Sequence, residues 1–234
     1  DPRVSAITPG SQAFFESLGV WPAMQQRRVS PYTHMHVHET DGTAEINFCA
    51  ADIHAPVLGH IVENRVMVTA MHDELRMQPH LDCLMPASVA ALDNRPDAVV
   101  ITLETGRRLS ARLVIAADGA QSPVRQLAGF STREWDYEHD AIVCSVRTEK
   151  HHQQCARQIF MDQGVLAFLP LAADDNASGH WCSIVWSVTP TTAQGLMTMD
   201  NSAFCKALSH ASEHWLGEVT QSGKRFSFPL RQRH

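Results

Sequence analysis

The sequence predicts an α/β fold that combines helices with mixed β-sheets, and three features support this class. Residues 113–117 are apolar on both faces, as in a strand inside a larger sheet, and a turn and a short helix follow them. Apolar residues recur at steps of one, three or four over residues 63–77, which is typical of an amphipathic helix. The final third of the chain contains long strand-like runs rich in aromatic side chains, which predict a sheet with one strongly apolar face.

Three elements are predicted in the first part of the chain. A serine suited to capping, three apolar positions on one face and a terminal glycine predict a short helix over residues 11–19. The runs MHVHE and EINFC flank an Asp-Gly turn at residues 40–43, and this combination predicts a β-hairpin. The amphipathic helix over residues 63–77 follows.

The middle and last parts of the chain are predicted to be rich in strands. Three β-rich runs separated by turns predict a meander over residues 87–117, whose last strand, 113–117, we expect to be buried. Ser122 at a cap position and Pro123 at the first helical position predict a short helix that ends at Gly129. In the last third we expect strands at 140–148, 156–160, 164–171, 180–188 and 224–230, and a helix within 201–216.

The composition excludes some function classes. The 19 Lys and Arg residues against 25 Asp and Glu give a net charge of −6, which excludes a basic nucleic-acid footprint. No stretch approaches the roughly 20 apolar residues that a membrane-spanning helix needs, so we expect a cytoplasmic protein with peripheral membrane contact at most. The 6 cysteines contain no CxxC pair, and we expect them to be reduced and mostly buried.

Histidine is unusually frequent, with 14 in the chain. His34, His36 and His38 alternate, so a β-strand would present all three on one face, either as metal ligands or as an ordinary exposed strand face. Because no HExxH motif or His-Cys cluster accompanies them, we predict no metal site.

The segment around Asp118 carries the strongest signal for chemistry. The predicted strand delivers Asp118 and Gly119 at its carboxyl end, where ligands bind in open α/β sheets, and the next helix begins there. Gly119 lets the backbone approach a phosphate, Asp118 can accept from a ribose or orient amides, and Arg125 can meet a phosphate. A purely structural Asp-Gly turn is the alternative interpretation.

Several segments together resemble one family. IAADGAQSPVR, residues 115–125, resembles the Asp-Gly motif of the flavoprotein aromatic hydroxylases, the family that includes para-hydroxybenzoate hydroxylase. The segment that begins at Arg3 resembles the family's flavin-contacting arginine segment. LGHIVEN resembles its strand-to-helix segment, whose polar residue, here Asn64, reaches the flavin. Residues 135–149 and the strand-like runs after them resemble the ubiquinone-biosynthesis branch, whose members include hydroxylases of polyprenylphenols.

The resemblance implies a cofactor, a substrate and site residues. It implies that reduced nicotinamide cofactor, NAD(P)H, reduces bound FAD, and that the flavin and oxygen then hydroxylate a prenylated phenol, so no catalytic side chain is assigned. Contact with other ubiquinone-biosynthesis proteins is a further expectation. On the cofactor side the resemblance places Arg3, Asn64, Asp118, Gly119 and Arg125. The candidates for an apolar substrate pocket, each also a candidate for plain core, are Phe168, Leu169, Pro170, Trp186 and Val188.

The resemblance also implies a domain organisation. Residues 1–30 and 58–132 match part of a FAD-binding, Rossmann-like domain, and residues 31–57 and 133–230 match a substrate-binding β-sheet domain interleaved with it. The family's GxGxxG turn and its later Gly-Asp motif have no counterpart in the sequence, so we expect a truncated fragment that cannot hold FAD and is inactive alone. The alternatives are a non-catalytic module that binds substrate or a partner, and a sister flavin hydroxylase acting on another ubiquinone intermediate.

Overall fold

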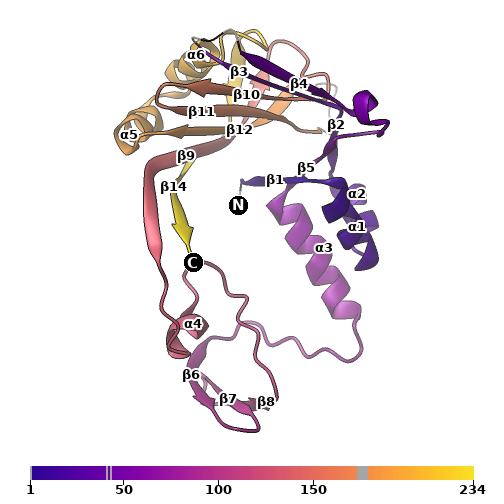
Figure 1. Cartoon of the computed structure of the whole chain (residues 1–234), viewed down its shortest axis with the longest axis vertical. Coiled ribbons are helices and arrows are strands. Elements are labelled where there is room, and N and C mark those ends of the chain that lie inside the picture. The colour runs from indigo at the N-terminus through magenta and orange to yellow at the C-terminus, as the bar shows by residue number, and fades with distance from the viewer. Residues whose placement is uncertain (1, 41, 43, 173–178) are drawn as a thin grey trace. The chain divides into compact units, whose positions relative to one another are not determined.

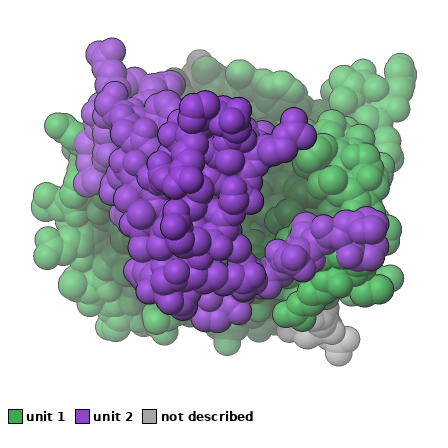
Figure 2. Space-filling model, turned by 90° about the horizontal axis from the view of Figure 1, so that it is seen from below, with its two compact units in different colours: residues 1–78, 138–230 green, residues 79–137, 231–234 purple. Residues whose placement is uncertain are grey.

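The computed structural model describes residues 2–40, 42, 44–172 and 179–234, and it confirms the predicted α/β class (Figure 1). The chain divides into two compact units, coloured separately in Figure 2. Unit 1 comprises residues 1–78 and 138–230, and unit 2 comprises residues 79–137 and 231–234. No helix of the described residues is long and apolar enough to cross a membrane.

Unit 1 begins with a three-stranded antiparallel sheet of order β1-β5-β2. Its strands are β1 (Val4–Ile7), β2 (Ser30–Tyr32) and β5 (Gly59–Glu63), and its helices are α1 (Pro9–Ser17), α2 (Trp21–Arg27) and α3 (Asn64–Met77). Apolar side chains from these elements form a small core that includes Trp21, Met24, Val62 and Val66. The core fixes β1 beside the start of α3.

The helix predictions in this region are confirmed with two differences. The N-cap of α1 is Thr8, whose hydroxyl accepts from the backbone N–H of Ser11, so Ser11 is inside the helix rather than capping it. The predicted apolar face of α1 is only partly buried, because Phe14 is 60% exposed. Helix α2 was not predicted, and its N-cap, Val20, makes no side-chain cap hydrogen bond that the sequence could reveal.

Unit 1 also contains an eight-stranded mixed sheet, and its strands β9 and β14 continue into the residues of unit 2. The strand order is β13-β9-β12-β11-β10-β3-β4, with β14 paired to β9, and β10 runs parallel to β3. The strands are β3 (His34–Glu39), β4 (Glu45–Cys49), β9 (Glu134–Thr148), β10 (Cys155–Met161), β11 (Gly164–Pro170), β12 (Trp181–Val188), β13 (Val219–Ser222) and β14 (Phe226–Arg233). The hairpin β3-β4 and the predicted strands of the last third are therefore confirmed, although turn residues 41 and 43 lie outside the described residues.

The two faces of this sheet differ. Helices α5 (Pro190–Thr198) and α6 (Asn201–Ala211) cover one face, as Figure 1 shows, and a short 3-10 helix, η1 (Ala50–Ile53), follows β4. Phe168, Ile184 and Phe204 are each at most 1% exposed in the core under the helices. We call the opposite side the open face. Residues that alternate with the core positions along each strand point to this open face, as the strand register shows. They include Val143, Val185, Ala167, Leu169, Val37 and Ile46.

Unit 2 contains a three-stranded antiparallel sheet and a short helix. The sheet joins β6 (Val89–Asn94), β7 (Val99–Leu103) and β8 (Arg108–Ala111), and α4 (Pro123–Leu127) follows with Ser122 as its N-cap. The predicted meander and the predicted cap are confirmed. One prediction is wrong: residues 113–117 form no strand, and Leu113 and Ile115 are 74% and 80% exposed. No strand of the described residues pairs with this segment, so its apolar sequence is not buried in a sheet.

We expect buried His152 in unit 1 to make the stability depend on pH. Burial is the main reason why the pKa of His152 is lowered to about 4, and its ring accepts from the Gln154 N–H while facing the Leu171 carbonyl. The neutral ring is therefore favoured in the folded state, and unfolding takes up a proton between the ordinary pKa, near 6.5, and pH 4. We expect the free energy of unfolding to fall by about 3 kcal/mol as the pH drops through this window. Urea unfolding of the wild type and of His152→Gln at pH 7.5 and pH 4.5 checks this, and an equal loss in both proteins would contradict it.

Candidate functional site

The Asp-Gly segment of unit 2 forms a tight loop that is closed by its own side chains. The Asp118 carboxylate accepts from the Ser122 hydroxyl and, at 3.1 Å, from the backbone N–H of Val124. The Ser122 oxygen in turn accepts from the N–H of Arg125 at 2.9 Å. Gly119 has a φ of +85°, a left-handed conformation that favours glycine. The loop is thus held over the first turn of α4 by Asp118 and Ser122 together.

The charge of Asp118 is stabilised by this loop. The pKa of Asp118 is lowered chiefly by the hydrogen bond from Ser122, with smaller contributions from the Val124 N–H and the Arg125 charge. The carboxylate is therefore ionised throughout the neutral range. Because the carboxylate accepts hydrogen bonds from its own loop, Asp118 acts here as a positioning residue for Gly119 and Arg125.

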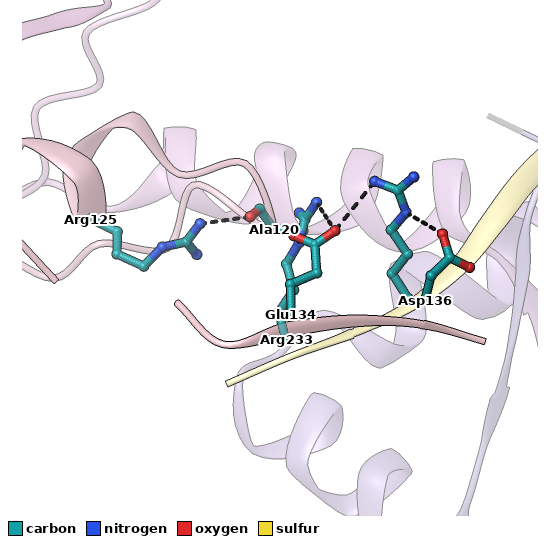
Figure 3. Close-up of polar contacts among 6 residues, drawn as sticks. Ala120, Arg125, Glu134, Asp136 and Arg233 are labelled. Atoms are coloured by element: carbon teal, nitrogen blue, oxygen red, sulfur yellow. Dashed lines mark hydrogen bonds and ion pairs between the residues drawn. The ribbon is translucent and has the colours of Figure 1, made fainter. Parts of the chain in front are cut away.

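Arg125 borders a cavity of about 530 Å³ within unit 2. Its Nη2 donates to the Ala120 carbonyl at 2.9 Å (Figure 3), while its Nε is buried and has no hydrogen-bond partner among the described residues. The cavity combines this cation and the Asp-Gly loop with apolar walls. Its lining includes Leu92, Val99, Val114, Asp118, Gly119, Ser122 and Phe130. A half-buried cation beside a glycine backbone can bind the anionic group of an otherwise apolar ligand.

A second polar group in unit 2 joins the ends of β9 and β14, and Figure 3 shows it. Glu134 accepts from Arg233 Nε at 2.7 Å and from Arg231 Nη1 at 3.2 Å, and Arg231 Nε donates to Asp136 at 3.1 Å. Arg233 is the main reason why the pKa of Glu134 is lowered. These exposed pairs add little stability, but they engage both arginines with carboxylates. Arg125 is therefore the better candidate for an anionic ligand in this unit.

Arg3 and Asn64 come together in unit 1. Because β1 pairs with β5, Asn64 follows directly after the strand beside Arg3, and its N–H donates to the Arg3 carbonyl at 3.0 Å. The Ser5 hydroxyl donates to Oδ1 of Asn64 at 2.8 Å. The amide N–H groups of Asn64 therefore point away from Ser5. The sequence did not reveal Ser5, because it lies 59 residues from Asn64 and only the strand pairing brings them together.

The predicted cofactor residues therefore form two sets. Arg3 and Asn64 belong to unit 1, and the Arg3 guanidinium also lies 5.1 Å from the centre of the Phe228 ring. Asp118, Gly119 and Arg125 belong to unit 2, where the loop and the cavity bring them together.

The candidates for the substrate pocket separate by sheet face. Phe168 and Trp186, at 1% and 6% exposed, lie in the core under α5 and α6, and Pro170 is buried with the same strand parity as Phe168. Leu169 points to the open face and is half-buried. On that face Ser183, 1% exposed, has a hydroxyl with no hydrogen-bond partner among the described residues. Contact between a substrate and Phe168, Pro170 or Trp186 stays a prediction, and the open face is the more accessible apolar surface.

The alternating histidines of β3 have other partners. His36 Nε2 lies 3.2 Å from Glu45, and His38 Nε2 lies 3.5 Å from Glu213. His34 contacts Cys49 instead. Within residues 2–40, 42, 44–172 and 179–234, no three His, Cys, Asp or Glu side chains form a group that could hold a metal ion.

Comparison with known proteins identifies relatives. A family model described as FAD binding domain matches residues 1–213. The chain is 36% identical over 234 residues to the 3-demethoxyubiquinol 3-hydroxylase of Escherichia coli, a match that covers 100% of this chain and 58% of that protein. It is 33% identical over 219 residues to the mitochondrial ubiquinone biosynthesis monooxygenase COQ6 of Xenopus tropicalis, which covers 89% of this chain and 46% of that protein. The chain thus spans about half the length of these curated relatives.

The fold comparison agrees with the sequence comparison. The crystal structure of PqsL from P. aeruginosa in complex with 2-aminobenzoylacetate matches with a TM-score of 0.80 at 18% identity, covering 97% of this chain and 63% of that chain. At this identity the match shows the fold alone. Together these matches confirm the predicted resemblance to flavoprotein aromatic hydroxylases and to their ubiquinone-biosynthesis branch.

Proposed function

Because this chain belongs to the FAD-binding domain family of flavoprotein aromatic hydroxylases, we propose that it forms part of a monooxygenase that hydroxylates the ring of a prenylated phenol in ubiquinone biosynthesis. The observation that carries the proposal is the closed Asp118 loop beside a cavity that Arg125 helps to line. The name of the Escherichia coli relative, 3-demethoxyubiquinol 3-hydroxylase, favours a reduced quinone, itself a prenylated phenol, as the ring that is hydroxylated.

In the proposal, the residue set of each unit offers groups that suit one part of FAD, taken for each unit by itself. Arg125, whose buried Nε lacks a partner among the described residues, would meet a phosphate, and Gly119 would let it approach the backbone. Asn64, oriented by Ser5, would donate its amide N–H groups to the flavin, with Arg3 beside it. When bound, FAD supplies the redox chemistry with oxygen, and NAD(P)H is the proposed reductant.

The chain's own residues would orient the ring and exclude water rather than attack it. No nucleophilic side chain is needed when the cofactor supplies the chemistry. In the proposal the ring and its prenyl tail lie on the open face of the large sheet. Leu169, Val185 and Val37, which are all half-buried, offer an apolar surface there.

The relatives are about twice as long as the chain, so the proposal assigns the rest of the flavin site to the part of their length that the chain does not match. The isolated chain would then hold FAD poorly and be inactive. We further propose that the enzyme is cytoplasmic, reaches its substrate by peripheral contact with the inner membrane, and meets other proteins of ubiquinone biosynthesis.

A chimera tests the function. Residues 1–234 replace the matching segment of the Escherichia coli relative, and the chimera is assayed for flavin absorbance and for NAD(P)H-dependent hydroxylation of a panel of prenylated phenols. We expect bound FAD and a hydroxylated product, and the position of the new hydroxyl group separates the sister reactions. A folded chimera without FAD would contradict the assignment, and binding of prenylated phenol without turnover would favour the non-catalytic module.

Replacing Asp118 with alanine tests the role of the loop. We expect FAD affinity in the chimera to fall about tenfold, because Ser122 and the Val124 N–H lose the carboxylate that holds Gly119 and Arg125 in place. FAD titration followed by flavin fluorescence measures the change. Asp97→Ala, at an exposed position of the same unit outside the loop, is the matched control and should bind FAD normally. Unchanged affinity in Asp118→Ala would overturn the positioning role.

A further inference from the structure

Cys49 and His34 form a side-chain pair that the proposed function does not use. The register of β3 and β4 places His34 opposite Cys49, and the distance from Cys49 Sγ to His34 Nε2 is 3.4 Å. Cys49 is half-buried and His34 is exposed, so the pair borders solvent. A thiol within hydrogen-bond reach of an imidazole is the arrangement of an activated nucleophile with its base.

Thr33 completes the arrangement. Its Oγ1 lies 2.9 Å from Nδ1 of His34. When Nδ1 carries the ring proton and donates to Thr33, the lone pair of Nε2 faces the Cys49 thiol and can accept its proton. Thr33, His34 and Cys49 are therefore placed as an orienting group, a base and a nucleophile would be.

We propose that Cys49 is a reactive thiol, activated by His34, and a site of covalent modification by soft carbon electrophiles. His34 Nε2 takes the thiol proton and the sulfur forms a bond to the electrophilic carbon. With iodoacetamide as the electrophile, the carbon–iodine bond breaks, iodide leaves with the bonding electron pair, and the imidazolium returns the proton to solvent. The step needs no oxidant, reductant or metal.

The other cysteines provide internal comparisons. Burial raises the pKa of Cys144 and of Cys182 to about 12, so both stay protonated and shielded. Cys155 and Cys205 are also buried. Cys83 is exposed, and within the described part of the chain no imidazole lies within hydrogen-bond reach of it. A faster alkylation rate at Cys49 than at Cys83 would therefore reflect the neighbouring imidazole rather than solvent access alone.

The test is site-resolved alkylation of the folded chain. The protein is treated with limiting iodoacetamide at pH 7, samples are quenched over time, and digestion with mass spectrometry gives the rate at each cysteine. We expect Cys49 to react at least about tenfold faster than Cys83, and the buried cysteines to react only after denaturation. We also expect the rate at Cys49 to fall less steeply than that at Cys83 between pH 8 and pH 6.

Variants separate the effect of the His34 base on the Cys49 alkylation rate from the effect of solvent access. His34→Asn should reduce the Cys49 rate to that of Cys83, and Thr33→Val should give an intermediate rate. His36→Asn, at the next histidine on the same strand face, should leave the Cys49 rate unchanged, because His36 contacts Glu45 instead. Equal rates at Cys49 and Cys83 in the wild type would overturn the proposal, as would a fast Cys49 in folded His34→Asn. If His34→Asn does not fold, the Thr33→Val rate and the wild-type pH profile decide the question.

Discussion

Replacing Phe168 with alanine is expected to lower the free energy of unfolding by about 4 kcal/mol. The Phe168 side chain is 1% exposed and lies in the core beneath α5 and α6, beside Ile184 and Leu166. Its removal leaves a cavity that the paired strands β10, β11 and β12 cannot close without losing register. Urea unfolding of the chain, followed by tryptophan fluorescence, measures the loss.

The neighbouring residue provides the matched variant. Leu169 is half-buried on the open face, so Leu169→Ala should cost only about 1 kcal/mol of stability. In the chimera, however, Leu169→Ala should weaken binding of a prenylated phenol roughly tenfold, because apolar area in contact with the ring or tail is lost. Stability is thus assigned to one face of β11 and ligand binding to the other.

The opposite pattern would reverse this assignment. If Phe168→Ala stayed stable and lost substrate affinity, while Leu169→Ala bound normally, the substrate would contact the face under the helices. The original assignment of Phe168, Pro170 and Trp186 to the pocket would then be correct.

The difficulty with these residues shows what a strand pattern can and cannot predict. The apolar run over residues 164–171 correctly predicted a strand, since strand-forming composition is a local property. Both faces of β11 are apolar, however, so the sequence could not indicate which face α5 and α6 would cover. Helix α5 was itself missed, although Thr189 caps it and Pro190 occupies its first turn, which are both readable signals.

The prediction of a buried strand at residues 113–117 was wrong for a different reason. Their apolar sequence was interpreted as a buried strand, but a strand is buried only when other strands pair with it, and none of the described residues does so. The loop that follows was predicted well, because the Ser122 cap and the Asp118-Gly119 turn depend on neighbours within six residues. Contacts between distant segments, such as Ser5 with Asn64 and His34 with Cys49, depend on strand pairing and were not predicted.

Gly164→Ala is expected to destabilise unit 1 by about 4 kcal/mol, or to prevent its folding. Gly164 is the first residue of β11 and has a φ of +149°, within the region that L side chains rarely adopt. A Cβ there would lie 1.8 Å from the Ser187 carbonyl oxygen of the neighbouring strand β12. This neighbour is backbone held by the pairing of Val165 with Ser187, so it cannot move aside as a flexible side chain could.

The matched control is Gly195→Ala, at an exposed glycine inside α5 where an added Cβ meets nothing within 4 Å. It should stabilise the chain by about 0.5–1 kcal/mol, because alanine favours a helix interior. Thermal and urea unfolding of the two variants should therefore move in opposite directions from the wild type. A Gly164→Ala protein as stable as the wild type would mean that β11 begins in a different register. Because a one-residue shift exchanges the two faces of a strand, Phe168 and Leu169 would then have to be reassigned to the opposite faces.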